Sequence, residues 1–176
     1  MRLHQLKLDF IPEQDRLLLR VSTDDQLEVR LWLTRRSLRL LWPRLVQMAR
    51  ASPEVAMQSN PEARDALVGM QRERALSRAN FAEPFAEVPR EMPLGAEPIL
   101  VARIQTDKDG DGHQVLGLVP QHGRGIRLTM DNNLLHSLCK LLQTAVAKSD
   151  WDMVLELPAL QTQSDADGAA VPKTVN

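Results

Sequence analysis

Tyrosine is absent from this chain of 176 residues, and three tryptophans with three phenylalanines bring the aromatic share to only 3%. The core must therefore be built mainly of Leu, Val, Ile, Met and Ala, and few rings are left on which bases or sugars would stack. The chain also holds a single cysteine, Cys139. One cysteine excludes an internal disulfide and fits a reducing compartment.

Long apolar runs are lacking as well. No stretch approaches the roughly 20 residues of a membrane span, and residues 1–9 (MRLHQLKLD) alternate apolar and polar side chains where a signal peptide would be continuously apolar. The formal net charge of −1 leaves no overall basic surplus, although it allows a local basic surface. We therefore expect a cytoplasmic protein that is not associated with a membrane.

A pattern of strand followed by helix occurs twice in the chain. Residues 29–34 (VRLWLT) and 126–131 (IRLTMD) each resemble a short strand that ends in a helix N-cap. When the two segments are aligned without a gap, three pairs of leucines in the following helices also match: Leu38 with Leu135, Leu41 with Leu138, and Leu45 with Leu142. This repeat predicts an α+β fold of two strand-strand-strand-helix halves, with antiparallel sheets packed on two amphipathic helices.

The repeat and the composition together predict the domain organisation. With 43% hydrophobic and 26% charged residues, the chain is long enough for one domain with a substantial core. We expect a single α+β domain over residues 1–157 and a disordered polar tail over 158–176. The expected parts of the domain are half one at 1–50, a helical insertion at 51–97 and half two at 98–157.

Several local features refine this expectation. Pro43 falls within the first helix, where it should kink the helix or restart it. Apolar patterning predicts a strand over 99–104 and a short closing strand over 151–157. The second helix, from about Asn132 to Lys148, has a broad apolar sector, with a polar side formed by four residues: Asn133, His136, Lys140 and Gln143.

Residues 51–98, the insertion and the residue after it, contain six prolines and one clear helix signal. Asn60 is followed by proline and glutamate, a typical helix start, and the helix should run to about Arg78. We expect this helix to be mobile or only lightly docked, because its apolar face is thin: Ala63, Ala66, Leu67 and Met70. Phe81 and Phe85 should hold the returning chain against the core.

One loop resembles part of a calcium site. Asp107, Asp109 and Asp111 are spaced as in the first half of a calcium-binding loop, but Leu118 stands where such a loop needs its bidentate glutamate. Strands are also predicted on both sides of the loop, which favours a solvated hairpin turn with weak calcium affinity at most. The four histidines are dispersed and are expected at the surface without a metal: His4, His113, His122 and His136.

The sequence carries no pattern typical of an enzyme. A nucleophile elbow, a phosphate loop and a dinucleotide fingerprint are all missing, and Cys139 lies among leucines, which predicts a buried and inert thiol. We therefore expect neither catalysis nor a cofactor. A pocket of mixed polar side chains where the two sheets diverge would be needed to favour an enzyme.

Arginine is concentrated in one region of the chain. Residues 28–50 contain six arginines and a single acid, Glu28. One interpretation is a solvated helix face whose arginines pair with acids of the insertion, such as Glu62, Asp65 and Glu73. The other is a surface for single-stranded nucleic acid, in which arginines hold phosphates and one ring stacks on a base. Its candidate residues are Arg30, Trp32, Arg35, Arg36 and Arg39.

Residues 11–20 (IPEQDRLLLR) and 31–36 (LWLTRR) resemble a family of uncharacterised proteobacterial proteins of the Burkholderia kind. This resemblance covers both halves, but not the insertion or the tail, and implies no functional residue. In element order alone, the two halves are also similar to the Whirly family of single-stranded-DNA-binding proteins, although each half here has three strands where that fold has four. Fold analogy does not locate a site.

Two functions follow from the sequence as hypotheses. The first is a non-enzymatic interaction protein, whose insertion helix and sheet edges bind a protein partner or a second copy of the chain. The alternative is single-stranded nucleic-acid binding through the arginine-rich strand and helix.

Overall fold

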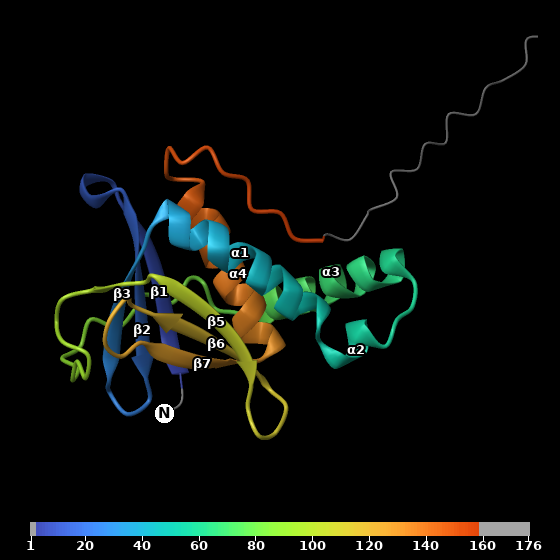
Figure 1. The fold of residues 1–176 in the computed structure, drawn as a ribbon, viewed down its shortest axis with the longest axis horizontal. Helices are drawn as coiled ribbons and strands as arrows, with labels where there is room; N and C mark the ends of the chain where they lie inside the picture. The colour runs from blue at the N-terminus through green and yellow to red at the C-terminus, as the bar shows by residue number, and fades with distance from the viewer. Residues whose placement is uncertain (1–2, 159–176) are drawn as a thin grey trace, which may run out of the picture.

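The structure is a computed structural model that describes residues 3–158. It has an α+β fold, as the sequence predicts (Figure 1). In these residues the strands are β1 (Leu3–Ile11), β2 (Arg16–Thr23), β3 (Glu28–Leu33), β4 (Ile99–Leu100), β5 (Arg103–Lys108), β6 (Gln114–Val119) and β7 (Ile126–Met130). The α-helices are α1 (Arg35–Arg50), α2 (Pro53–Ala56), α3 (Pro61–Arg78) and α4 (Asn132–Val146). The tail expected over 158–176 lies, from residue 159 on, outside the described residues.

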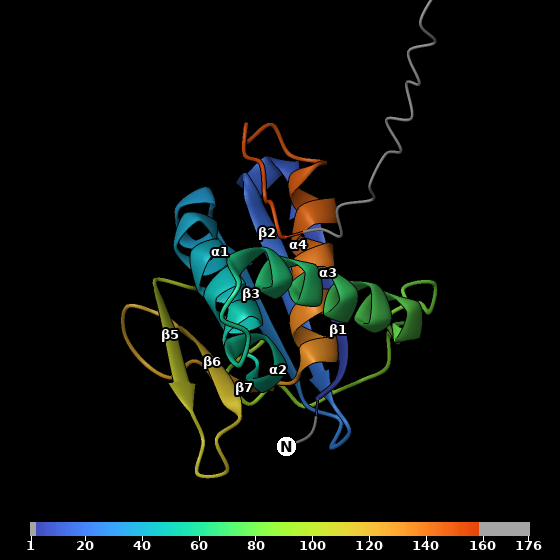
Figure 2. The ribbon, with the colours of Figure 1, turned by 90° about the vertical axis from the view of Figure 1, so that its right-hand side faces the viewer.

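The strands form two sheets, with the orders β1-β2-β3-β4 and β5-β6-β7. Helices α1 and α4 cover one face of the first sheet, which we call its inner face, and α3 lies across α4 on the far side (Figures 1 and 2). The second sheet stands beside α1, against which β5 packs. The core therefore lies between the first sheet, the two long helices and the second sheet.

Alternation along the strands explains why one face of the first sheet is covered. Leucine and valine at the odd-numbered positions of β2 and β3 are buried toward the helices: Leu17, Leu19, Val21, Val29, Leu31 and Leu33. Because neighbouring side chains on a strand point to opposite faces, the even-numbered residues form the outer face. That outer face carries most of the polar side chains discussed below.

Both predicted helix caps are present. The Thr34 hydroxyl accepts a hydrogen bond from the Ser37 backbone N–H, and the Asp131 carboxylate accepts one from Leu134 at the start of α4. The three leucine pairs of the sequence repeat are all buried in the core: Leu38, Leu41, Leu45, Leu135, Leu138 and Leu142. The repeated strand-helix unit is thus confirmed at its caps and at its packed positions.

Two local predictions were wrong in part, since α1 does not restart at Pro43 and the strand expected over 99–104 is not a single strand. Helix α1 runs without interruption through Pro43, which is exposed. Because proline has no N–H, the backbone carbonyl oxygen four residues earlier loses its helical hydrogen bond, and this oxygen lies on the solvent side of the helix. The strand predicted over 99–104 is divided, because β4 pairs in parallel with β3 of the first sheet whereas β5 begins the second sheet. The free edge of β3 thereby gains a partner from the other half of the chain.

The insertion helix packs more firmly than expected. Helix α3 packs on α4, and its buried residues are Val68, Gly69, Gln71 and Ala75, whereas Met70 is 49% exposed. The buried Gln71 amide is bound on both sides, since it accepts from Ser52 and donates to Glu54. The expected apolar face was thus misplaced, because a small residue and a satisfied amide provide much of the contact.

The closing strand expected over 151–157 does not form. This segment instead is held by two indoles: Trp42 donates to the backbone oxygen of Glu156 at 3.1 Å, and Trp151 donates to Asp15. The Trp151 ring also meets Phe10 edge-on, with ring centroids 6.0 Å apart. Side-chain contacts therefore replace the strand pairing that the apolar pattern predicted.

Candidate functional site

A buried carboxylate lies on the outer face of the first sheet. The Glu28 side chain is only 2% exposed, and its Oε1 accepts hydrogen bonds from Nε of Arg20 at 2.9 Å and Nε of Arg30 at 2.8 Å. Its Oε2 accepts two more, from Nη2 of Arg20 at 3.2 Å and from Nη1 of Arg90 at 3.3 Å. Arg20 belongs to the neighbouring strand, whereas Arg90 comes from the chain between α3 and β4. One acid thus joins the sheet to a distant segment.

That segment, residues 79–98, crosses the outer face of the first sheet, and we call it the strap (light green in Figure 1). The Gln5 side chain holds its backbone, because Oε1 accepts from the Ala86 N–H at 3.0 Å and Nε2 donates to the Pro84 oxygen at 3.3 Å. At the other side of the sheet, the backbone of Glu91 bonds to Glu28 at the start of β3 and to Gln26 in the turn before it. The strap therefore spans the sheet from β1 to β3.

Phe85 of the strap contacts two guanidinium groups. The Cζ atoms of Arg20 and Arg90 lie 4.4 and 4.9 Å from the centre of its ring, within the range of cation–π contacts. Arg20 also binds Glu87 of the strap with two hydrogen bonds, of 2.6 and 2.9 Å. The prediction that Phe81 and Phe85 hold the returning chain against the core was wrong. Phe85 holds the chain against the outer face of the sheet, and Phe81 is 46% exposed and lies at a pocket.

The charges of this cluster stabilise one another. Burial raises the pKa of Glu28, but the hydrogen bonds from Arg20 and Arg30 outweigh burial and hold that pKa at about 2. The hydrogen bond from Arg20 likewise lowers the pKa of Glu87, and the same bond raises the pKa of Arg20. All of these side chains are therefore charged at neutral pH, and the strap is fastened by ionic contacts.

Next to the cluster, the outer face carries a row of apolar side chains. Leu18 pairs with Trp32, and Trp32 pairs with Leu100 of β4, so the three side chains lie side by side on one face. Leu18 and Trp32 are half-buried and Leu100 is 45% exposed. The other two tryptophans, Trp42 and Trp151, are buried. This apolar row remains partly open to solvent beside the strap.

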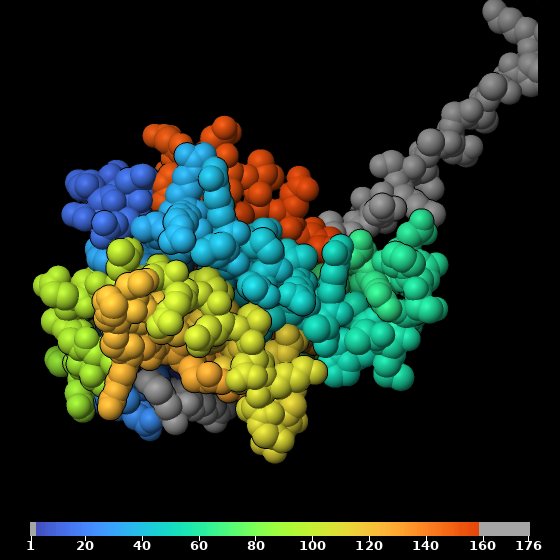
Figure 3. All heavy atoms as spheres, in the orientation of Figure 1, coloured from blue at the N-terminus to red at the C-terminus, as the bar shows by residue number. Residues whose placement is uncertain are grey.

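The candidate nucleic-acid residues are divided between two layers. Arg30 and Trp32 lie on the outer face of the first sheet, and Arg30 is bound to Glu28. Helix α1 packs on the inner face and carries the others; Arg36 and Arg39 are exposed, whereas Arg35 is half-buried. Figure 3 shows that α1 (cyan) lies open across one side of the molecule. The structure thus separates the strand residues from the helix residues.

The alternative interpretation of the arginines, pairing with acids of the insertion, holds at one position. Arg50 forms a 3.0 Å ion pair with Asp65 of α3. For the exposed arginines Arg36, Arg39 and Arg44, the described residues supply no ion pair. The basic side of α1 is therefore only partly neutralised.

The calcium candidates do not converge on one point. The predicted β5–β6 hairpin is present, and Asp107 binds Arg127 on β7 at 3.1 Å. Asp109 caps the turn, where its Oδ1 accepts from the backbone of residues 111 and 113, and these bonds lower its pKa although burial opposes them. The atoms that could share a cation belong instead to Asp109, Asp111 and His113, within 4.8 Å of one another. The side chains of Asp107 and Asp109 thus have structural partners within the hairpin and its neighbouring strand.

His136 is the residue whose environment the sequence predicted wrongly. It is 1% exposed, not at the surface, and neither ring nitrogen has a hydrogen-bond partner among the described residues. Helix α3 covers this side of α4, where Arg72 donates to Gln143. Burial, with a smaller contribution from the Arg72 charge, lowers the pKa of His136 to about 4.

The predicted burial of Cys139 is confirmed. Burial raises the pKa of its thiol to about 12. At neutral pH the group is thus a thiol and not a nucleophilic thiolate.

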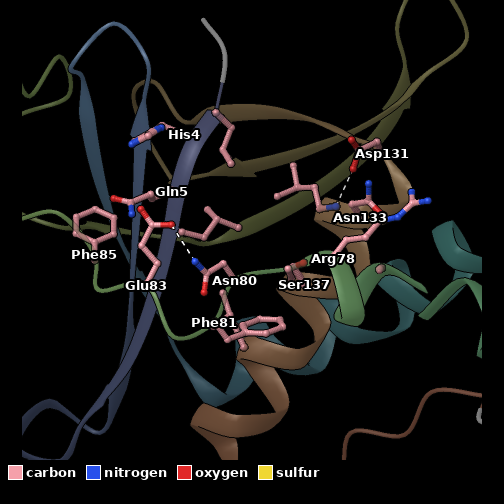
Figure 4. A pocket seen from close by; sticks show the side chains of 16 residues that line it. His4, Gln5, Arg78, Asn80, Phe81, Glu83, Phe85, Asp131, Asn133 and Ser137 are labelled. Carbon is pink, nitrogen blue, oxygen red and sulfur yellow. Dashed lines mark hydrogen bonds between the residues drawn. The ribbon is translucent and has the colours of Figure 1, made fainter. Parts of the chain in front are cut away.

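Two cavities flank the start of α4. One, of about 470 Å³, lies between β1, the end of α3, the strap and α4 (Figure 4). Its walls combine leucines with polar side chains such as Arg78, Asn133 and Ser137. The Asn80 amide binds Glu83 at its edge.

The other cavity, of about 450 Å³, lies where the two sheets diverge. Its charged side chains, Arg127 and Asp131, are bound to Asp107 and to the α4 backbone. Arg127 and Asp131 thus make structural contacts and do not point together into the cavity as a reacting pair.

Comparison with known proteins gave no match: no family model fits the chain, and neither a curated protein nor a solved structure is significantly similar to it. The family resemblance of residues 11–20 and 31–36 therefore rests on those residues alone. Among residues 3–158, no helix combines the length and the apolar character needed to span a bilayer.

Proposed function

We propose that this protein is a non-enzymatic cytoplasmic interaction protein that binds a protein partner, or a second copy of itself, on the outer face of its first sheet. The observation that carries this proposal is the apolar row of Leu18, Trp32 and Leu100, which lies partly exposed on an otherwise polar face. Adjacent exposed apolar side chains are typical of interaction surfaces.

The sheet edge beside this row supports the proposal. β4 contributes only two residues, and its pairing with β3 leaves its other edge unpaired among the described residues. An extended segment of a partner would add to such an edge through backbone hydrogen bonds while its side chains contact the row. Met70 on the insertion helix α3 is also apolar and exposed. The sequence had indicated this helix as a further contact surface.

Leu100→Asp is expected to abolish partner binding, because it places a charge in the centre of the proposed contact. The tagged protein is incubated with lysate, retained proteins are identified, and self-association is measured by sedimentation. The matched control is Leu40→Asp, since Leu40 on α1 has nearly the same exposure, 46% against 45%. A partner, or a dimer, kept by the control and weakened at least about tenfold by Leu100→Asp supports the proposal. Equal binding by both variants contradicts it.

A second candidate function is single-stranded nucleic-acid binding along α1. It is favoured by the three exposed arginines without an ion pair in the described chain, Arg36, Arg39 and Arg44. Arginine binds phosphate oxygens through its planar fork of donors. We place this function second because Arg30 is bound to Glu28 and lies on a different layer from the helix.

If α1 binds single strands, affinity for labelled DNA or RNA should fall steeply between about 50 and 200 mM salt, because bound counterions are released. The variant Arg36→Glu with Arg39→Glu should lose this binding, and Arg74→Glu on α3 is the control. Tryptophan emission should stay nearly unchanged, because Trp32, the one half-buried indole among the three, lies on the outer face of the first sheet and not beside α1. Binding that is absent at low salt, or unchanged in the double variant, excludes this second function.

A further inference from the structure

The strap shows what kind of chain the outer face of the first sheet accepts. Phe85 and Glu87, two residues apart, are both bound by Arg20, one through its ring and the other through two hydrogen bonds. Gln5 binds the backbone of the same segment on both sides of Phe85. We call Gln5, Arg20 and Glu28 the clamp. It holds an extended peptide with an aromatic side chain followed two positions later by a carboxylate.

The contacts of Gln5 define the chemistry of the occupant. Its amide accepts from the N–H of residue 86 and donates to the oxygen of residue 84, so it recognises a backbone donor and a backbone acceptor in one segment. A peptide offers this pair of groups at a fixed spacing, whereas a sugar-phosphate backbone has no N–H. The clamp is therefore suited to protein rather than to nucleic acid.

Removal of the strap would leave the clamp with binding capacity. Glu87 and Arg90 would depart together, and Glu28 would remain with Arg20 and Arg30. The sheet would then carry one more positive than negative charge at this place. The outer edge of the Arg20 guanidinium, which now binds Glu87, would be free for another carboxylate.

The strap is fastened in a way that permits local opening. The Glu87 side chain is 62% exposed and Val88 is 51% exposed. Between α3 and β4 the chain forms no helix or strand, apart from an isolated bridge between Glu91 and Leu27. Segments with few buried apolar contacts open at a lower free energy than the core does.

From these contacts we infer that the clamp is a binding site for an extended segment of a partner protein in which an aromatic residue is followed two positions later by a carboxylate, and that the strap is its internal competitor. This inference rests on the proposed function and names the chemistry of the partner. The apolar row lies next to the clamp, so a partner longer than the strap would contact both.

Internal competition determines how affinity should respond to mutation. A segment tethered at both ends has a high effective concentration, and an outside peptide binds only the fraction of molecules in which the strap is open. If the strap were open in about 1% of molecules, weakening it would tighten binding of an outside peptide by up to about a hundredfold. The wild-type chain should therefore bind weakly and a strap-weakened variant more tightly.

The test uses a labelled peptide of residues 82–91 (AEPFAEVPRE) and the full chain with Phe85→Ala and Glu87→Gln, with binding followed by anisotropy. The variant is expected to bind the peptide at least about tenfold more tightly than wild type does. A peptide carrying the same two substitutions is the control ligand. Adding Gln5→Ala to the variant should abolish binding while leaving Arg20 and Glu28 paired, which avoids disruption of the buried ion pair.

Several outcomes would overturn the inference. If the folded variant binds the control peptide as well as the native one, recognition does not involve Phe85 and Glu87. No binding at micromolar protein, or preferred binding of a single-stranded oligonucleotide, also rejects a peptide site. Failure here combined with a partner lost on Leu100→Asp would reject the clamp and leave the proposed function standing. Peptide binding with no partner lost on Leu100→Asp would support the clamp and reject the apolar row.

Discussion

Replacing Glu28 with glutamine is expected to lower the free energy of unfolding by about 3 to 5 kcal/mol, the usual effect of removing one partner from a buried ionic cluster. The carboxylate is the acid shared by three arginines, and the Arg90 side chain is as buried as Glu28 itself, at 2% exposure. Without the negative charge, Arg20 and Arg90 would face each other with only the exposed Glu87 to compensate. Urea unfolding at pH 7 measures the change.

The matched control for this prediction is Glu83→Gln, an exposed acid of the strap whose side chain accepts one hydrogen bond within residues 3–158, from Asn80. Glu83→Gln should change the free energy of unfolding by less than about 0.5 kcal/mol.

The contribution of Glu28 to stability should also depend on pH. Because the pKa of Glu28 is about 2, below the ordinary value of 4.5, this contribution is complete above pH 4.5 and disappears as the pH falls through 2. If Glu28→Gln lowers the free energy of unfolding by less than about 1 kcal/mol at pH 7, the cluster does not depend on the negative charge of Glu28.

Acidification from pH 7 to pH 4 is expected to destabilise the protein by about 3 kcal/mol through His136 alone. Burial lowers the pKa of this side chain from 6.5 to about 4, so the unfolded chain binds more protons between these values. The stability is fully present above pH 6.5 and is lost as the pH falls toward 4. The figure of about 3 kcal/mol follows from about 1.4 kcal/mol for each pH unit between the two pKa values.

His136→Leu tests this prediction, because leucine has no proton to gain and leaves no unpartnered ring nitrogen. Unfolding by urea is compared at pH 7 and pH 4.5 in wild type, in His136→Leu and in His122→Leu, whose exposed ring serves as the control. The acid-induced loss should shrink markedly in His136→Leu and persist in His122→Leu. Equal losses in all three proteins would show that His136 does not determine acid sensitivity.

Much of the fold was accessible from the sequence because its signals are local. Alternation in β2 and β3 and the 3.6-residue period in α4 predict which side chains are buried, and the cap residues Thr34 and Asp131 mark where helices begin. Asn60 with the following proline similarly placed the start of α3. These features depend on residues within one or two turns of each other.

The candidate site was less accessible because its contacts are distant in the chain. The Arg20–Glu87 bond spans 67 residues and the Gln5–Ala86 bond spans 81, and no local pattern relates such positions. The isolated acid Glu28 within an arginine-rich region was the one signal that pointed toward the cluster. For His136, helical periodicity predicted the polar side of α4 correctly, but not that another helix would cover that side.

The sequence by itself determined the class of the fold, the ends of its helices and the leucine core, because periodicity and capping act over a few residues and decide which face each element must bury. Only the tertiary structure decided that β4 pairs with β3, that α3 covers His136 and that the strap lies on the outer sheet with Phe85 in contact with two arginines. Those arrangements result from competition among all surfaces for burial and for charge partners, and such competition is settled only when the whole chain is packed.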